Sequence, residues 1–283
     1  MSSDGTPRRA RSGARAPRPV TSLQNERVKL IRSLDMRKAR RETGLFVAEG
    51  AALLVTARQH NFVPVMLVML AGAARDGIAR GLVEWALDSG SECLEVSEAV
   101  LAKIAGKQNP QMLLGVFRQR WTELPDERHL TESDVWLAVE QGRDPGNLGT
   151  IIRTVEAVGA KGVILVGPSC DPFSREAVRA SMGSVFAVPL LRMTPQSFLA
   201  RLAMWPGDVV GAHLRASKDF RSVAYRGPVM LVMGSEGPGL SEALAQACTE
   251  LVRIPMAGSL DSLNLAVAAA LLLYQLRGPA LRL

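Results

Sequence analysis

The C-terminal part of the chain contains the stretch Leu231-Val-Met-Gly-Ser-Glu-Gly-Pro-Gly-Leu240. It begins inside an apolar run, residues 229–233, that has the pattern of a buried strand, and Gly234 ends that run. Glu236 follows in a loop that also contains Gly237 and Gly239. Because glycine lets a backbone come close to another group, we interpret Glu236 as part of a site. A turn between a strand and a helix in any α/β domain is the ordinary alternative.

A second apolar run, residues 251–254, ends at Pro255 and is followed by a polar segment. We expect Ser262 to N-cap a final helix over residues 263–276. That helix is apolar almost all round, and its strongly polar side chains are Asn264 and Gln275. A helix of this composition is typically buried, so Asn264 on its first turn needs a protein partner or a substrate.

A third loop lies upstream, after a predicted strand over residues 135–140. It reads Gln141-Gly-Arg-Asp-Pro-Gly-Asn-Leu-Gly149 and precedes a predicted helix over residues 150–158. The loop is longer than most connections between a strand and a helix. Asn147 is expected just before the helix, either as its N-cap or as a site residue. Arg153 is expected on the helix, either solvated or, because its neighbours are apolar, pointing into a cleft.

The composition is that of an ordinary soluble globular protein. The 283 residues suffice for one large or two small domains with a substantial core. The longest apolar stretches, 64–74 and 266–274, are too short to span a bilayer. The three cysteines are far apart and the three histidines do not cluster, which predicts neither a disulfide framework nor a metal site. We therefore expect a reducing, cytoplasmic setting and no metal.

Positive charge is concentrated at the N-terminus. Residues 1–50 carry twelve Arg or Lys and five Asp or Glu, so they account for the whole net charge of +7. A basic segment on a neutral body indicates a polyanionic partner such as RNA, although a solvated arm would have the same composition. Residues 1–18 are expected to be a disordered basic tail. A transit peptide is less favoured because the segment lacks a clear amphipathic face.

The rest of the chain alternates between strand and helix patterns, which predicts an α/β protein. One long helix is expected over residues 25–41, and a strand over residues 185–189. We expect a smaller α/β domain over residues 19–120, a linker over residues 121–133 and a second domain over residues 134–283. Because strand and helix keep alternating in the second domain, a parallel sheet with helices on both faces is predicted.

The glycine-rich loops suggest a nucleotide-like ligand, so the common phosphate-binding motifs are relevant. The loop after Gly234 lacks the Lys-Ser/Thr pair of a P-loop, which disfavours ATP hydrolysis. It also lacks the glycine spacing that follows the first strand of a Rossmann unit. No Gly-x-Ser-x-Gly elbow with a suitable histidine is present, which disfavours acyl hydrolysis.

Three segments resemble the motifs of the SpoU (TrmH-type) RNA ribose 2′-O-methyltransferases, in the order found in that family. They are Asp144-Pro-Gly-Asn-Leu-Gly-Thr-Ile-Ile-Arg153, Leu231-Val-Met-Gly-Ser-Glu-Gly-Pro-Gly-Leu-Ser241 and Ile254-Pro-Met-Ala-Gly-Ser-Leu-Asp-Ser-Leu-Asn264. Residues 175–186 also resemble the family's intervening segment. The resemblance covers residues 130–277 approximately. The first hundred residues or so resemble, less specifically, the RNA-binding α/β domain that often precedes it.

The resemblance implies a SPOUT fold, in which the C-terminal part of a parallel sheet is threaded into a deep trefoil knot. It also implies a homodimer formed by helices of the knot. The implied cofactor is S-adenosylmethionine, bent among the knot loops and held largely by backbone groups. Carried over to this sequence, the cofactor-binding positions are His213, Leu214, Gly234, Ile254, Met256 and Leu263.

The same resemblance gives Arg153 the central catalytic role. Arginine is a poor base because it is nearly always charged, so its chemistry favours positioning a phosphate and stabilising an oxyanion, and the role of base stays open. Asn147 would orient the ribose or Arg153, and Glu236 would anchor its loop. Ser262 and Asn264 would line the site and place the substrate phosphate or hydroxyl.

The implied activity is methylation of a ribose 2′-hydroxyl in RNA with S-adenosylmethionine as methyl donor. Ribosomal RNA is the expected substrate because an RNA-binding domain precedes the motifs, and tRNA is the alternative substrate. A catalytically silent RNA-binding or ribosome-assembly factor is an alternative of another class. The complete set of motif residues argues against that alternative.

Overall fold

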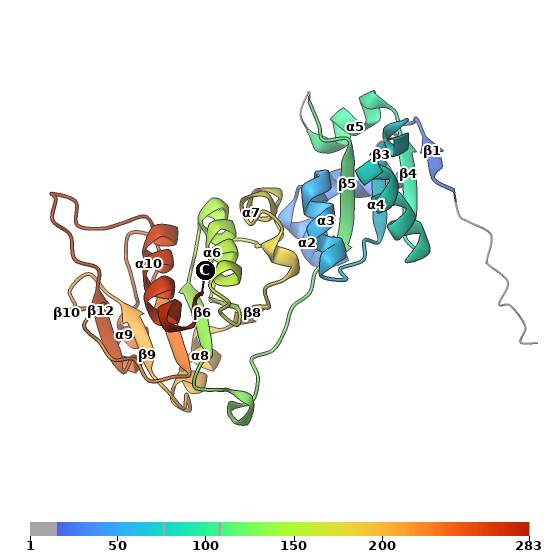
Figure 1. Cartoon of the computed structure of the whole chain (residues 1–283). Coiled ribbons are helices and arrows are strands. Elements are labelled where there is room, and N and C mark those ends of the chain that lie inside the picture. The colour runs from blue at the N-terminus through green and yellow to red at the C-terminus, as the bar shows by residue number, and fades with distance from the viewer. Residues whose placement is uncertain (1–15, 76, 107–108, 283) are drawn as a thin grey trace, which may run out of the picture.

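The structure, a computed structural model, describes residues 16–75, 77–106 and 109–282. These residues form a five-stranded sheet in the N-terminal part and a seven-stranded sheet in the C-terminal part (Figure 1). Fifteen residues of the expected basic tail, 1–15, lie outside the described residues. Over the described part of the chain, no helix is both long enough and apolar enough to cross a membrane.

The N-terminal sheet is mixed. Its strands have the order β1-β4-β3-β5-β2, in which β5 runs antiparallel to both of its neighbours and the other pairs are parallel. Helices α1 and α5 share a core with one face of the sheet, and α3 and α4 share a core with the other. The elements are β1 (Arg18–Val20), α1 (Glu26–Ser33), α2 (Arg37–Thr43), β2 (Leu45–Glu49), α3 (Ala51–Gln59), β3 (Met66–Leu70), η1 (Ala73–Arg75), α4 (Gly77–Asp88), β4 (Glu92–Val96), α5 (Glu98–Ala105) and β5 (Leu113–Arg118).

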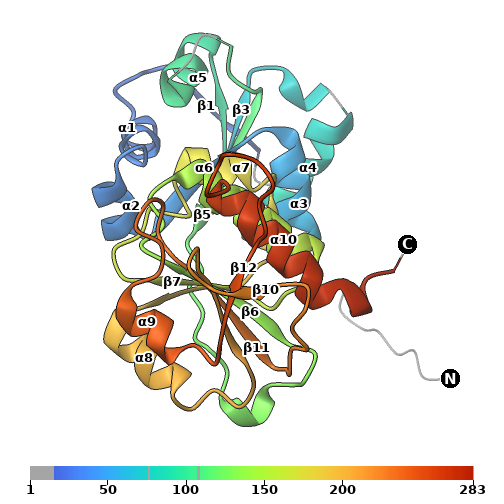
Figure 2. The same cartoon turned by 90° about the vertical axis from the view of Figure 1, so that its left-hand side faces the viewer.

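The C-terminal sheet is parallel throughout, which confirms the predicted α/β class. Its strand order is β10-β12-β9-β11-β6-β7-β8. Helices α8 and α9 pack on one face, while α6 and α10 pack on the other, beside α7 (Figure 2). The elements are η2 (Glu127–His129), β6 (Val135–Glu140), α6 (Pro145–Ala157), β7 (Val163–Val166), α7 (Arg175–Ala180), η3 (Ser184–Phe186), β8 (Leu190–Met193), α8 (Pro195–Leu202), β9 (Val209–Ala212), β10 (Lys218–Asp219), β11 (Val229–Met233), α9 (Glu242–Ala247), β12 (Glu250–Arg253), α10 (Leu265–Arg277) and η4 (Gly278–Ala280).

A cluster of aromatic side chains joins the two sheets. The ring of Phe46 on β2 lies 4.8 Å from that of Phe173, in the segment before α7. Phe117 on β5 lies 4.8 Å from Phe186, and Phe62 lies 5.1 Å from the same ring. Because all five rings are buried, the hydrophobic core continues from one sheet into the other. The N-terminal sheet therefore packs against the part of the chain that carries α7.

Two predicted elements differ from the structure. The expected helix 25–41 is broken into α1 and α2, because the Arg40 guanidinium donates to the carbonyls of Leu34 and Asp35 and satisfies them without a continuous helix. The expected strand 185–189 is the 3₁₀ turn η3, and the strand begins only after Pro189. Proline lacks the N–H that a ladder needs, and Val185 and Phe186 are instead buried in the core.

Three further features of the structure differ from the expectation: the start of the first strand, an additional helix and the burial of the last helix. Arg18, assigned to the tail, begins strand β1, which pairs with the edge of β4 and buries Val20. Helix α9 was not predicted, although Ser241 N-caps it by accepting from the Leu244 N–H. The last helix is not buried all round, because Val267, Leu271 and Tyr274 are 48%, 41% and 53% exposed.

Phe46→Ala tests the shared core. The substitution removes a ring that is fully buried and in contact with four other aromatic rings. We expect the free energy of unfolding to fall by about 3–5 kcal/mol, because transfer and cavity terms add. The control Phe46→Leu should cost about 1–2 kcal/mol, because most of the volume is kept. Urea denaturation measures both free energies. Equal losses of stability in the two variants would contradict tight packing of the aromatic cluster between the two sheets.

Candidate functional site

Asn147 connects the three loops that carry the sequence motifs. Its amide nitrogen donates to the Glu236 carboxylate, in the loop after β11. Its amide oxygen accepts a hydrogen bond of 2.9 Å from the side-chain amide of Asn264, at the start of α10. We call these three residues the Asn147 cluster. The structure thus brings together three of the five predicted catalytic side chains, which are up to 117 residues apart in sequence.

Asn147 lies inside helix α6 rather than before it. Asp144 is the N-cap and accepts from the Asn147 N–H at 2.6 Å, and Pro145 occupies the first turn. The expected nine-residue loop is therefore only four residues long. The dipeptide Asp-Pro was the signal for this start, because proline fits the first helical turn and aspartate caps it. The Asn147 side chain is consequently free of the N-cap role and points to the other two loops.

The loop after β11 is shaped by its glycines. Gly234 packs so closely on the backbone of Gly239 and Leu240 that a Cβ there would overlap both. Gly237 and Gly239 have φ angles of 90° and 76°, which side-chain-bearing residues rarely adopt. The N–H groups and carbonyls of Ser235 and Gly239 bond to each other at 3.0 Å. The chain therefore folds back on itself at Glu236 and holds the carboxylate beside Asn147.

Glu140 is a site residue that the sequence analysis missed. It ends strand β6, is only 5% exposed, and its carboxylate accepts from the Ser241 N–H at 2.8 Å. A carboxylate buried at the end of an apolar strand was the available signal, because such groups are buried only when they are paired. Glu140 fixes the far end of the loop that carries Glu236.

Asn264, not Ser262, caps the last helix. Its side-chain oxygen accepts from the N–H groups of Ala266 at 2.9 Å and Val267 at 3.3 Å. Its side-chain amide meanwhile donates to Asn147, so one residue both caps α10 and joins the cluster. Ser262 is exposed, and its hydroxyl donates to the neighbouring Asp261 at 3.3 Å. Among the described residues, the hydrogen bonds that join the Asn147 cluster therefore do not include Ser262.

Arg153 lies on α6 and is exposed. Among the residues that the structure describes, no hydrogen bond or ion pair holds its guanidinium. One turn earlier, Gly149 packs against α7, where a Cβ would lie 2.6 Å from the side chain of Ala180. Gly149 thus lets α6 pack closely on α7, while Arg153, one turn further along the same face, remains exposed to solvent. It is a cation available to a ligand.

The six predicted cofactor positions lie on loops at the carboxyl ends of β9, β11 and β12. The His213 N–H donates to the Val252 carbonyl at 2.9 Å, which holds the β9 loop beside β12. Leu214 is 51% exposed and Leu263 is 36% exposed, while Ile254 and Met256 are half-buried. Exposed apolar side chains beside loops with small side chains suit the binding of an aromatic ring whose polar atoms are recognised by main-chain groups.

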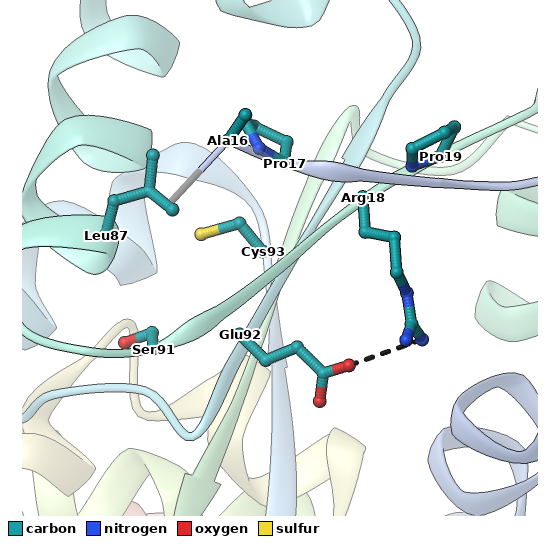
Figure 3. Close-up of a pocket in the computed structure, with 8 residues that line it drawn as sticks. All are labelled: Ala16, Pro17, Arg18, Pro19, Leu87, Ser91, Glu92 and Cys93. Carbon is teal, nitrogen blue, oxygen red and sulfur yellow. Dashed lines mark ion pairs between the residues drawn. The ribbon is translucent and has the colours of Figure 1, made fainter. Parts of the chain in front are cut away.

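A separate hollow of about 690 Å³ lies at the far edge of the N-terminal sheet, between the segment leading into β1 and the start of β4 (Figure 3). It is flanked by an ion pair of 3.3 Å between Arg18 and Glu92. None of its lining residues belongs to the Asn147 cluster or to the predicted cofactor positions. This hollow is therefore not the candidate site.

Nucleophilic thiol chemistry is not supported near the site. Cys170 follows β7, and burial together with the nearby Asp144 carboxylate raises the pKa of its thiol to about 11. Such a thiol is almost entirely protonated at neutral pH. In the described part of the chain, no group of three His, Cys, Asp or Glu side chains is arranged to hold a metal ion.

Comparison with known proteins agrees with the motifs. Residues 134–274 match the model of the SpoU rRNA methylase family, and residues 25–115 match that of the MRM3-like substrate binding domain. The 23S rRNA (guanosine(2553)-2′-O)-methyltransferase RlmP of Bacillus subtilis is 30% identical over 92% of this chain and 99% of its own length. The 23S rRNA (uridine(2479)-2′-O)-methyltransferase of Streptomyces viridochromogenes is 31% identical over 93% of both chains.

Solved structures show the same relationship over the whole chain. The AdoMet-bound rRNA methyltransferase from Sinorhizobium meliloti has a TM-score of 0.84 and 43% identity, over 94% of this chain and 99% of that one. The SpoU methyltransferase AviRb from Streptomyces viridochromogenes, in complex with AdoMet, has a TM-score of 0.81 and 28% identity, over 91% and 98%. The chain therefore belongs to the SpoU rRNA methylase family.

Proposed function

We propose that this protein transfers the methyl group of S-adenosylmethionine to a ribose 2′-hydroxyl of ribosomal RNA. The observation that carries the proposal is the Asn147 cluster, which joins all three motif loops through two amide hydrogen bonds. Family membership and the rRNA-methylating relatives support the reaction and the class of RNA. The AdoMet-bound structures of similar proteins support the cofactor.

The residues present fit this cofactor. Gly234 and the glycines that follow it keep side-chain bulk out of the loop after β11, which suits a cofactor that is held largely by backbone groups. The apolar side chains of Leu214, Ile254, Met256 and Leu263 would contact the adenine, and His213 would hold the β9 loop. When bound, S-adenosylmethionine supplies an electrophilic methyl group on a sulfonium.

Arg153 and the Asn147 cluster would act on the RNA. The guanidinium of Arg153 is exposed and is paired with none of the described residues, which suits a phosphate beside the target ribose and the negative charge that develops on its 2′-oxygen. An exposed arginine remains charged, which favours this electrostatic role over that of a base. Asn147 would orient the ribose, with its own side chain held by Glu236 and Asn264. Ser262, whose hydroxyl donates to the neighbouring Asp261, would place the substrate.

The N-terminal sheet would bind RNA as a separate substrate-binding domain over residues 19–120, joined by the segment 121–133 to a methyltransferase domain over 134–283. The match to a substrate-binding family model supports this division. Exposed basic residues of α2, Lys38 and Arg41, would contact phosphates. The protein would work in the cytoplasm, which suits its three free cysteines.

We also propose a deep trefoil knot in the C-terminal sheet and a homodimer. The family supports both, and so does the return of α10 from the edge strands to pack beside α6 and β11. An apolar face of α10 is left open in the single chain, with Val267, Leu271 and Tyr274 exposed. Apolar patches of this kind mark interaction surfaces. A second copy of α10 would cover it.

Arg153→Ala tests the reaction. Incubation with labelled S-adenosylmethionine and ribosomal RNA from cells that lack the protein should give a 2′-O-methylated ribose, mapped as an alkali-resistant linkage. We expect the substitution to lower the rate by about 100- to 1000-fold, as for the loss of one oxyanion-stabilising donor. Arg128→Ala, at an exposed ion pair with Asp126, is the control and should retain full activity. Labelling of tRNA alone would shift the substrate class, and no labelling of either RNA would favour a silent binding factor.

Gly234→Ala tests the cofactor loop. The new methyl group would overlap the backbone of Gly239 and Leu240, so the loop after β11 must change its conformation. We expect the affinity for S-adenosylmethionine, measured by calorimetry, to fall by at least about tenfold, which corresponds to roughly 1.4 kcal/mol. Gly77→Ala, in the N-terminal part of the chain, is the control, because a Cβ there meets nothing within 4 Å. Equal affinities of the two variants would remove the β11 loop from the cofactor site.

Leu271→Glu tests the dimer. A charge in the middle of the exposed apolar face of α10 would be desolvated in a dimer but not in a monomer. Light scattering coupled to size-exclusion chromatography should give a dimeric mass for the wild-type protein and a monomeric mass for the variant. Met204→Glu, at a residue that is 62% exposed after α8, should stay dimeric. A monomeric wild-type protein would overturn the proposed assembly.

A further inference from the structure

We propose that Arg40 is a positioning residue for the reaction: it fixes the N-terminal sheet relative to the Asn147 cluster and thereby sets which ribose of a bound RNA reaches the site. The inference rests on the proposed function, because it assigns a role in RNA methylation. It is carried by a buried ion pair between the two parts of the chain and by the contacts that lead from this pair to Asn147.

Arg40 is the basic residue of α2 that the chain buries. Its side chain is 5% exposed, and its Nε donates to the Asp171 carboxylate at 2.7 Å. Its Nη1 donates to the carbonyls of Leu34 at 2.8 Å and Asp35 at 2.9 Å. Its charge and donors are therefore used within the protein. A side chain in this state cannot serve as a phosphate contact.

The partner of Arg40 belongs to the loop after β7, which is hydrogen-bonded to the segment that leads into helix α6. In that loop the Cys170 N–H donates to the Gly142 carbonyl at 2.7 Å. Gly142 lies two residues before Asp144, the N-cap that binds the Asn147 N–H at 2.6 Å. The path from Arg40 to the Asn147 cluster thus consists of one ion pair and two hydrogen bonds, joined by short pieces of backbone.

Two further arginines form hydrogen bonds across the same contact between the N-terminal and C-terminal parts of the chain, one from each part. Arg37 on α2 donates to the Ser169 carbonyl at 2.8 Å. In the reverse direction, Arg175 on α7 donates to Asp35 at 2.5 Å and to the Ile104 carbonyl at 2.9 Å. These bonds are directional and lie beside the aromatic cluster, so they fix the orientation of α2 as well as its distance from the site.

The basic residues of helix α2 consequently have two different roles. Lys38 and Arg41 are exposed and available to RNA phosphates, whereas Arg40 points inward to Asp171. RNA bound by Lys38 and Arg41 keeps a fixed position relative to the Asn147 cluster only while Arg40 stays bound to Asp171. A misplacement of about 1 Å can cost a factor of about a hundred in rate, so loosening this joint should affect turnover more than binding.

Asp171→Asn separates this role from an electrostatic one. The variant loses the charge partner of Arg40 but keeps the oxygen that accepts from the Phe173 N–H at 2.9 Å. It also makes the protein more positive, so an electrostatic account predicts equal or tighter RNA binding. Asp219→Asn is the matched control, because Asp219 likewise accepts from a backbone N–H two residues on and pairs with an arginine, but on the surface.

With ribosomal RNA from cells that lack the protein, we expect Asp171→Asn to lower kcat by about ten- to a hundredfold and to methylate additional riboses. Its KM for RNA and its affinity for S-adenosylmethionine should change less than about twofold, and Asp171→Glu should restore part of kcat. Asp219→Asn should match the wild type. Wild-type kcat and a single methylated ribose in folded Asp171→Asn would overturn the proposal.

A folding defect and a failure of the proposed function have separate outcomes. If Asp171→Asn does not fold, the double variant Arg40→Gln/Asp171→Asn removes the uncompensated buried charge and should show the same fall in kcat; full activity overturns the proposal. If the wild-type protein methylates no RNA, the proposed function fails. Hydrogen exchange at residues 142–147 then still tests the joint, and it should be faster in Asp171→Asn than in Asp219→Asn.

Discussion

The side chain of Asn147 is the element on which the site depends. A primary amide can donate and accept at once, and here it donates to Glu236 and accepts from Asn264. A side chain that can only donate or only accept hydrogen bonds would keep the bond to one of these loops and lose the bond to the other. Because Asn264 also caps α10, the same hydrogen bond fixes where the last helix begins. One amide therefore connects the start of α6, the loop after β11 and the start of α10.

The surrounding structure makes this bridge possible. The parallel sheet places the carboxyl ends of β6, β11 and β12 at one edge, so loops that are distant in sequence meet there. Gly234 lets the β11 loop fold against its own backbone, and the buried Glu140 fixes the end of that loop at Ser241. Arg153 is left outside this network, which suits its proposed role of binding an RNA phosphate that arrives from solvent.

Much of this could be predicted from the sequence, and the misses have physical causes. Apolar runs ended by glycine or proline identified β11 and β12, because the residues that bury a strand and those that end it are adjacent in the sequence. The start of α6 was predicted too late, because residues 141–149 are polar and were assigned to a loop although Asp144 and Pro145 have the pattern of a helix start. The inward role of Arg40 could not be predicted because its partner Asp171 is 131 residues away, and a local sequence pattern cannot show a tertiary ion pair. The break between α1 and α2 has the same origin.

The most direct test of the bridge is the affinity of Asn147→Asp for S-adenosylmethionine, measured by calorimetry against the wild-type protein. The variant has the same size, but it loses the donor to Glu236 and places a second carboxylate beside it. We predict that repulsion moves the β11 loop and weakens binding by at least about tenfold, or roughly 1.4 kcal/mol. An affinity within twofold of the wild type, in a folded protein, would contradict the claim that Asn147 assembles the site.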